Sequence, residues 1–590
     1  MSTQSITPKW DLTSFFPSLA SSEYAEAIQN FQELLDRTES DFKLWGVETG
    51  GTDSGHLALA VARLDELSDQ ARLIYAYASL HVSADSNDEE AQAALSSLQP
   101  SMTRLSKISK KLTAWIENFD IATVIQEQPQ LTDHAFSLKK TQRLAKHLMS
   151  PAEEALASDL AEVAGNAWGR LWGDFTSNLA VTVNGEQISM SAARALAHDP
   201  KSETRKAAYE AELAGWKASE ITMAACMNSI KGEANLLAKK RGWSSQLEES
   251  LFTNNMDQAS LDAMLSAAED SFPAWRKYLQ AKAELLGYQG GLNFYDIFAP
   301  VGQDSPWTWE EGKKFVEDGF RSYSDKLADF AVRSFEENWH DVSPRLGKRD
   351  GAFCSGVRAD ESRMLHNYKE SFGSVSTLAH ELGHAYHNLC LKDRTPSQKS
   401  TPMTLAETAS IFCETIIKRR AIQETSGLQR LAILEASLQG ACQVVVDITS
   451  RFKFESSVIE ARKNRELSPR ELCEAMLDAQ KATYGDGLNP NCLHPYMWAV
   501  KPHYYSYRAF YNYPYMFGLL FALGLYNVYQ ESPHGFHERY DDLLSSTGMD
   551  MAANLTNRFG IDITNKDFWA GSLSVLKQDI DAFCQEAKKL

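Results

Sequence analysis

The fold of this chain is decided around the stretch Val375-Ser-Thr-Leu-Ala-His-Glu-Leu-Gly-His-Ala-Tyr-His-Asn-Leu-Cys390. Its apolar residues recur at intervals of three and four, which predicts a helix. The stretch contains His380-Glu381-Leu382-Gly383-His384, an H-E-x-x-H motif. Histidines four positions apart lie one turn apart on the same face of a helix, so their imidazoles can bind one metal ion. Glu381 lies beside that ion, where a carboxylate can act as a general base on water.

The motif leaves the third metal ligand open, because catalytic zinc usually takes three protein ligands. A metzincin would have Gly at position 387 and His at position 390, but the chain has His387 and Cys390, which excludes that class. His387 lies seven residues beyond His380, about 10 Å along a helix, too far for one ion with Zn–N bonds of about 2.1 Å. We therefore expect His387 beside the ligands or in a substrate pocket, with ligation as the alternative.

The following segment offers a carboxylate as the third ligand. It reads Thr401-Pro-Met-Thr-Leu-Ala-Glu-Thr-Ala-Ser-Ile-Phe-Cys-Glu-Thr415, and its Thr and Pro are typical of a helix start. Glu407 follows His384 by enough chain for a loop and a returning helix. We predict that His380, His384 and Glu407 bind one Zn²⁺ ion per chain. The alternative for Glu407 is a position on a solvated helix face. Glu414 either orients a ligand imidazole or lies on a solvated helix face.

A second unusual segment, Lys501-Pro-His-Tyr-Tyr-Ser-Tyr-Arg-Ala-Phe-Tyr-Asn-Tyr-Pro-Tyr515, is dense in tyrosine. Six of the twelve residues from Tyr504 to Tyr515 are Tyr, and helical packing does not demand phenols. A phenol or an imidazole aimed at a developing oxyanion would supplement zinc in amide hydrolysis. The alternative is an aromatic core or interface whose hydroxyls are hydrogen-bonded elsewhere.

The remaining sequence predicts a mainly α protein of two domains, residues 1–195 and 196–590. Amphipathic helices dominate the first domain, except near residues 179–188, where Asn184-Gly185 between strand-like runs predicts a β-hairpin. Helical spacing continues over residues 202–240 and 258–286. Residues 351–376 read instead as short strands and turns directly before the H-E-x-x-H helix, which predicts a small β element there.

Composition narrows the class of protein further. The 590 residues include 43% apolar residues and carry a net charge of −19, which favours compact folding and argues against nucleic acid as a partner. The first ten residues lack the pattern of a secretory signal. Residues 517–525 are too short an apolar run to span a membrane and predict a buried core helix. Eight scattered cysteines favour reduced thiols in a cytoplasm.

The chain resembles the oligoendopeptidase F group of zinc metallopeptidases, which is related to thimet oligopeptidase. The resemblance covers nearly the whole sequence. It rests on Trp10-Asp-Leu-Thr-Ser-Phe-Phe-Pro17, Tyr295-Asp-Ile-Phe-Ala-Pro300, Thr377 to His387, Ala406-Glu-Thr-Ala-Ser-Ile-Phe-Cys-Glu414, and the His503-Tyr-Tyr and Phe510-Tyr-Asn-Tyr513 stretches.

This resemblance implies a two-lobed helical fold around a deep channel that admits only unstructured oligopeptides. It also implies that His380, His384 and Glu407 hold zinc and that Glu381 is the general base. The transition-state residues would be His503 and Tyr513, with Tyr507 or Tyr505 as a further phenol. The stretch from Gly351 through Ala352 and Phe353 to Ser355 resembles the strand that pairs with the substrate backbone. Family members differ on whether the equivalent of His387 belongs to the metal site.

Two alternative functions remain at this point. A peptidyl-dipeptidase or carboxypeptidase would trim C-termini, and Arg508 could then bind the terminal carboxylate, although a solvated Arg is the simpler interpretation. A helical peptide-binding protein with structural or no zinc is the other alternative, but such a site has no need of the base Glu381. The sequence does not specify the oligomeric state, and we expect oligopeptides as partners without a membrane.

Overall fold

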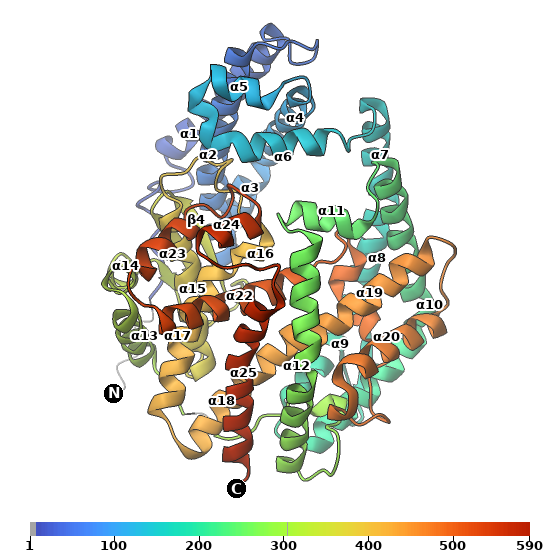
Figure 1. Ribbon diagram of the computed structural model, residues 1–590. Helices are drawn as coiled ribbons and strands as arrows, with labels where there is room; N and C mark the ends of the chain where they lie inside the picture. The colour runs from blue at the N-terminus through green and yellow to red at the C-terminus, as the bar shows by residue number, and fades with distance from the viewer. Residues whose placement is uncertain (1–7, 304, 590) are drawn as a thin grey trace.

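The computed structural model describes residues 8–303 and 305–589 (Figure 1). About 70% of the chain is helical, and the strands form only small sheets. The predicted mainly α, two-lobed fold is therefore confirmed. Three hydrophobic cores organise the helices, and each core draws on a different part of the chain.

The first core belongs to the N-terminal helices at the top of Figure 1. Large side chains such as Phe31, Trp115 and Leu138 are buried there because each helix turns an apolar stripe inward. Two strand residues, Val357 and Leu365, also join this core, so the N-terminal lobe packs on the small sheet described below. Its elements are α1 (Ser22–Leu44), α2 (Ser54–Ala84), α3 (Glu89–Ser97), α4 (Gln99–Ile116), α5 (Ile121–Glu127), the 3₁₀ turn η1 (Pro129–His134) and α6 (Ala135–Ala145).

The second core joins residues 165–240 to a later part of the chain. The predicted hairpin forms as β1 (Ala180–Val183) and β2 (Glu186–Ser189), with Asn184 and Gly185 both at positive φ, as a tight turn requires. The hairpin packs against α10 (Ser202–Lys240), which matches its predicted bounds. Around them lie α7 (Pro151–Val163), α8 (Gly165–Asn178), α9 (Met190–Ala195), η2 (Leu196–His198), α19 (Ile448–Arg462), α20 (Pro469–Tyr484), η5 (Gly485–Gly487), α21 (Met497–Val500) and η6 (Pro502–Tyr505).

The third and largest core surrounds the H-E-x-x-H helix, α15 (Phe372–Cys390). The helices α12 (Gln258–Leu285) and α25 (Lys566–Ala587) pack side by side through the middle of the molecule (Figure 1). The other elements are α11 (Gln246–Thr253), η3 (Phe294–Asp296), α13 (Trp309–Tyr323), α14 (Asp325–Glu336), α16 (Met403–Ala406), α17 (Thr408–Glu424), α18 (Gly427–Cys442), the π-helical η4 (Gln443–Asp447), α22 (Tyr513–Glu531), α23 (Phe536–Leu544) and α24 (Ala552–Arg558).

Residues 517–525 lie inside α22, and nearly all of them are buried, as expected for a core helix. A different run, Gly427–Arg462, is the one helix within residues 8–303 and 305–589 that is long and apolar enough to cross a membrane. Most of its apolar window, 61%, is buried inside the protein, so this run serves as a core helix.

A three-stranded sheet flanks α15, where short strands were predicted. Its order is β3 (His340–Asp341), β5 (Glu361–Leu365), β4 (Phe353–Arg358), with β4 antiparallel to β5 and β3 parallel to it. Because β4 has only β5 as a neighbour, one edge of β4 is unpaired within the described chain. An unpaired edge can accept an extended peptide as a further strand.

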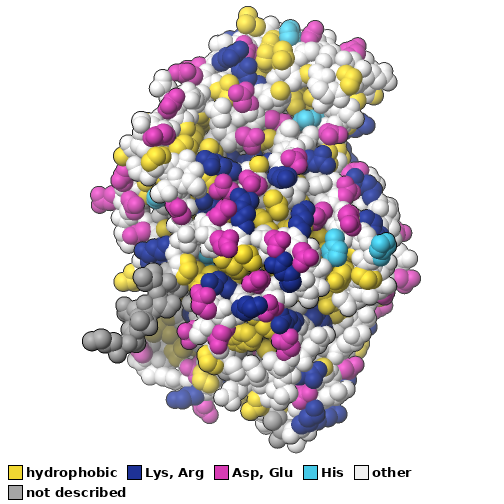
Figure 2. Space-filling view, turned by 90° about the vertical axis from the view of Figure 1, so that its left-hand side faces the viewer, with side chains coloured by type: hydrophobic (Ala, Val, Ile, Leu, Met, Phe, Trp, Pro, Cys, Tyr) yellow, Lys and Arg dark blue, Asp and Glu magenta, His cyan; other side chains and the backbone are white. Residues whose placement is uncertain are grey.

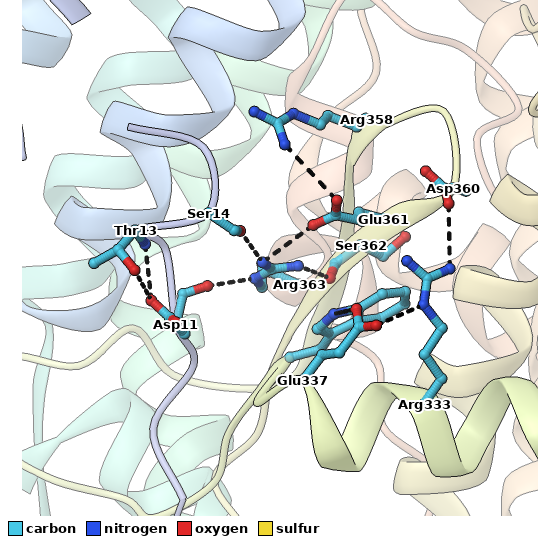
Figure 3. A network of polar contacts seen from close by, with 11 residues as sticks. Asp11, Thr13, Ser14, Arg333, Glu337, Arg358, Asp360, Glu361, Ser362 and Arg363 are labelled. Carbon is cyan, nitrogen blue, oxygen red and sulfur yellow. Dashed lines mark hydrogen bonds and ion pairs between the residues drawn. The ribbon is translucent and has the colours of Figure 1, made fainter. Parts of the chain in front are cut away.

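The N-terminal segment fixes this sheet through Arg363 on β5 (Figure 3). The guanidinium is 1% exposed and donates to the carbonyl of Asp11 and the hydroxyl of Ser14, each at 2.8 Å. It also lies 4.3 Å from the ring centroid of Phe15. A buried cation is stable only when its donors are matched, and here carbonyls, a hydroxyl and Glu361 match them. The Trp10–Pro17 stretch therefore joins the N-terminus to the sheet beside α15.

The face shown in Figure 2 carries acidic and basic side chains interspersed over most of its area. No continuous basic surface of the kind that tracks a phosphate backbone is visible among the described side chains on that face. The mixed charge agrees with the acidic composition. The exclusion of nucleic acid stays a prediction.

Candidate metal centre and substrate cavity

The metal helix α15 is held close to α17 by a glycine. Ser371 caps the helix by accepting a hydrogen bond from the Ser374 amide (3.3 Å). On the buried face, a Cβ at Gly383 would lie 2.5 Å from both the carbonyl oxygen of Ala409 and the Cα of Ser410. Only glycine allows this approach, which brings the start of α17 and the preceding Glu407 next to the two motif histidines.

The structure brings His380, His384 and Glu407 together. One ligand atom from each lies within 4.8 Å of the others. The Nε2 atoms of His380 and His384 lie 3.4 and 3.3 Å from the same Oε2 atom of Glu407. Two imidazole nitrogens and one carboxylate oxygen, with no fourth candidate ligand among the residues that the structure describes, form the donor set typical of catalytic zinc.

The charges of this cluster favour a cation between its members. Burial opposes ionisation of Glu407, but hydrogen bonds from His380 and His384 outweigh it and hold the pKa of Glu407 far below its usual range. Burial likewise opposes a charged His380, yet hydrogen bonds to Glu407 and Glu414 raise the pKa of His380. A site that stabilises positive charge at His380 and negative charge at Glu407 has the electrostatics that suit a divalent metal ion.

Glu414 binds the far side of the first histidine. Its Oε2 atom lies 3.2 Å from Nδ1 of His380, and its Oε1 atom accepts a hydrogen bond from Ser376 (3.2 Å). Lys418 forms an ion pair with the same carboxylate. Of the two interpretations of Glu414, this geometry favours the one in which it orients a ligand imidazole, because the side chain is only 21% exposed.

Glu381 lines a cavity of about 620 Å³, and one of its carboxylate oxygens makes no hydrogen bond to a described residue. The residue is 5% exposed, and its Oε2 atom has no hydrogen-bond partner among the described residues. Burial raises the pKa of Glu381. Buried carboxylate oxygens are normally hydrogen-bonded, so an unpartnered one beside a metal donor set makes Glu381 a candidate functional group.

His387 lines the same cavity but lies outside the cluster. Its Nε2 atom is 3.0 Å from Oγ1 of Thr547 and 3.2 Å from the carbonyl of Leu544. Burial lowers the pKa of His387 to about 4, so the ring is neutral near pH 7. This placement agrees with the distance argument against ligation.

Strand β4 forms one wall of the cavity. Ala352, Phe353, Cys354 and Gly356 line it, whereas Gly351 is exposed just before the strand and outside the lining. Asn388 on α15, which sequence reasoning missed, donates to Ser362 Oγ (3.2 Å) and so ties the sheet to the metal helix. No motif pointed to Asn388, because its role depends on a strand that is distant in sequence.

The tyrosine segment approaches the cluster through Tyr511 and Tyr515, which were not singled out from the sequence. His503 stacks on Tyr511 with ring centroids 4.6 Å apart, and the Tyr515 hydroxyl donates to that of Tyr511 (3.1 Å). Burial, the bond to Tyr511 and the negative charge of Glu407 raise the pKa of Tyr515. The close packing of Gly518 against Glu407, where a Cβ would lie 2.8 Å from Glu407 Cβ, holds α22 beside the cluster.

The three phenols that were predicted from the sequence make contacts of their own. Tyr513 is 1% exposed, and its hydroxyl accepts hydrogen bonds from Asn254 (3.3 Å) and Ser250 (3.4 Å). Tyr505 is buried against Trp172 and donates to a backbone carbonyl. Tyr507 is 74% exposed and bonds to Arg508. No tyrosine of the segment, Tyr511 and Tyr515 included, is among the described residues that line the cavity, and neither is His503 or Arg508.

The chain is similar to several known oligopeptidases, both in sequence and in fold. The chain is 23% identical to group B oligopeptidase PepB of Streptococcus agalactiae, over 97% of this chain and 95% of the relative. It is also 23% identical to oligopeptidase PepF of Bacillus subtilis, over 97% and 86%. Among solved structures, a peptidase from Chlamydophila abortus superposes with a TM-score of 0.86 at 21% identity, covering 99% of each chain. Oligoendopeptidase-F from Enterococcus faecium gives 0.70 at 19% identity, covering 96% of this chain and 99% of that one.

Family models match most of the sequence. The model of Peptidase family M3 matches residues 195–575, and the model named Oligopeptidase F matches residues 116–179. The M3 match alone spans more than half of the chain, including α15 and α17. The chain therefore belongs to peptidase family M3, within its oligoendopeptidase F group, and is a metalloendopeptidase.

Proposed function

We propose that this protein is a zinc-dependent endopeptidase that hydrolyses internal peptide bonds of short, unstructured oligopeptides. The observation that carries the proposal is the shared cavity of the His380, His384 and Glu407 donor set and the unpartnered carboxylate of Glu381. A structural zinc site would have a fourth protein ligand and no free carboxylate.

His380, His384 and Glu407 would hold one Zn²⁺ ion, with Glu414 fixing the tautomer and ring orientation of His380. When bound, zinc supplies a Lewis acid that polarises a peptide carbonyl and acidifies water. Glu381 accepts a proton from the attacking water with its free oxygen and later delivers it to the leaving amine.

Tyr511 and Tyr515 are the phenols best placed to donate to the developing oxyanion. They replace Tyr513 in our assignment, because the charge of Glu407 acts on Tyr515, whereas Tyr513 is 1% exposed and lies against Asn254 and Ser250. His503, stacked on Tyr511, holds that ring in place. The unpaired edge of β4 would bind the substrate backbone as an added strand, which requires an extended peptide.

Two further expectations stay as proposals. The eight thiols are all free, and we expect the enzyme in the cytoplasm. We also keep the division into residues 1–195 and 196–590, although the hairpin near the boundary shares its core with α10 of the second part.

Mass spectrometry of a mixed oligopeptide pool and one folded protein tests the proposal. We expect internal cuts in the peptides only, lost on chelation and regained with zinc. Dipeptides or single residues released from C-termini would instead identify a C-terminal trimming enzyme. An absence of cleavage by zinc-loaded protein would refute the enzymatic assignment.

A further inference from the structure

The substrate cavity carries three cationic side chains that the proposed hydrolysis does not use. Arg72 comes from α2 in the N-terminal lobe, Arg358 from the end of β4, and Lys399 from the loop between α15 and α16. They converge on one cavity in a chain whose net charge is −19. Cations that gather in a substrate cavity against the overall charge call for an anionic ligand.

The loop that carries Lys399 is fixed against α2. The Ser397 amide donates to Oδ1 of Asp65 (2.9 Å), and the Ser397 hydroxyl donates to Oδ2 (3.1 Å). Asp65 is 8% exposed and is also bound by His134 at 3.2 Å. Arg72 follows Asp65 by two helical turns and lies on the same face of α2. The face that anchors the loop therefore also presents Arg72 toward Lys399.

Lys399 is the least satisfied of the three cations. Its ammonium has no hydrogen bond or ion pair with any residue in the described ranges, although the side chain is half-buried. Burial, followed by the positive charge of Arg72, lowers the pKa of Lys399, and the negative charges of Asp69, Asp393 and Asp65 oppose that shift only in part. Holding two like charges close together costs free energy that a bound anion would recover.

The other two cations differ in how far they are already engaged. Arg358 lies 3.8 Å from Glu361 and stacks 5.0 Å from the ring centroid of Phe15. Arg72 pairs with Asp69 on its own helix, which leaves part of its five-donor guanidinium free. Arg358 is thus less engaged than Arg72, but Arg72 is the arginine whose positive charge acts on Lys399, so Arg72 and Lys399 form the pair that one ligand could bridge.

We infer that Arg72 and Lys399 form a carboxylate-binding subsite of the substrate cavity. The inference rests on the proposed function and adds to it a class of favoured substrate: peptides with a carboxylate that reaches these two side chains. The carboxylate is either an acidic side chain or the C-terminus of the peptide. A guanidinium and an ammonium in one cavity are opposite in charge to a carboxylate and can donate hydrogen bonds to both of its oxygens.

Matched quenched-fluorescence peptides test the subsite. One set exchanges Glu for Gln at each position around the cleaved bond, and a second set exchanges a free C-terminus for an amide. For wild-type enzyme we expect KM to be about tenfold lower for the carboxylate twin in one set. Lys399→Met should bring that ratio of KM values toward one. For Lys399→Glu, a third peptide with Lys in place of Glu is added, and its KM should be lower than that of the Glu peptide.

Lys392→Met is the matched control, because Lys392 is an exposed lysine near the same loop that does not line the cavity. It should keep the wild-type ratio. Thermal melting checks that each variant folds. If Lys399→Met fails to fold, Arg72→Met is measured in its place, and calorimetric binding of both twins to Glu381→Gln enzyme gives the preference without turnover.

The outcomes separate the sources of the carboxylate. If the KM ratio differs from one in the Glu and Gln set, the subsite binds an acidic side chain. If it differs from one in the C-terminal set, the subsite binds the terminal carboxylate. Equal KM values for all twins in wild-type enzyme, or equal effects of Lys399→Met on both twins, would overturn the subsite while leaving the peptidase intact. Wild-type enzyme that cleaves no twin would instead overturn the proposed function.

Discussion

Oε2 of Glu414 lies 3.2 Å from Nδ1 of His380, on the side of the ring opposite the Nε2 atom that faces Glu407. One imidazole is therefore held between two carboxylates. One of these carboxylates is a proposed metal ligand, and the other positions the ring.

Glu414→Gln should weaken zinc binding by about 10- to 100-fold, because the amide cannot stabilise charge on His380 as the carboxylate does. The measurement is a competitive zinc titration against a chelator. Glu424→Gln, at the exposed end of the same helix, is the control and should bind zinc like wild type. Equal affinity in both variants would remove Glu414 from the metal site.

Tyr515→Phe should lower kcat/KM by about 10²- to 10³-fold, because the hydroxyl that would meet the oxyanion is lost. Zinc content should not change. Tyr513→Phe, which loses only hydrogen bonds to Asn254 and Ser250, should reduce stability by about 1 kcal/mol and activity far less. Steady-state kinetics and thermal melting of the two variants separate the roles, and the reverse ranking of activity would restore Tyr513 to the mechanism.

Gly383→Ala should destabilise the protein by about 1–3 kcal/mol and weaken zinc binding, since the added Cβ would push α15 away from α17. Gly440→Ala is the matched helical control. No atom lies within 4 Å of a Cβ there, and the substitution should stabilise by up to about 1 kcal/mol. Chemical denaturation measures both changes. A Gly383→Ala protein as stable as wild type would show that the helices can separate freely.

The buried pair His340 and His366, with ring nitrogens 3.0 Å apart, should make stability depend on pH. Burial lowers the pKa of His366 to about 3 and that of His340 well below its usual range. Below pH about 6.5 these two histidines bind protons in the unfolded chain but stay neutral in the native protein. Stability should therefore be complete near pH 7.5 and fall as the pH drops, by up to about 1.4 kcal/mol per pH unit for each ring.

Denaturation midpoints at pH 7.5 and 5.5 measure that loss. His366→Gln, which removes one titrating ring, should flatten the dependence even if it lowers stability overall. A slope equal to that of wild type would contradict the assignment of a neutral native His366.

Helical periodicity was enough to predict α10, α12 and the H-E-x-x-H helix, because each presents a long, regular pattern of burial. Asn184-Gly185 predicted its hairpin for a local reason, the need for positive φ at both positions. The tyrosine segment has no helical periodicity that would tell which side chains share a face. Residues 506–512 form no regular helix and α22 begins only at Tyr513, so nothing in the sequence told which phenols face Glu407.

Long-range contacts explain why the sequence alone did not identify two further residues at the cavity. Arg72 reaches the cavity because Asp65, on the same helix, binds a loop more than 300 residues away in sequence. Asn388 binds Ser362 on β5, a contact between the H-E-x-x-H helix and the sheet. Neither relationship leaves a periodic or motif-like signal in a single sequence, and both became visible only once the N-terminal lobe and the sheet were placed.

Replacing Glu381 with Gln tests the central claim most directly, because it removes the proposed base and leaves the three metal donors in place. The measurement pairs zinc content per chain with turnover of a quenched oligopeptide. We predict one zinc per chain and a loss of turnover by at least a factor of about 10³. Turnover near the wild-type rate with zinc bound would contradict the account.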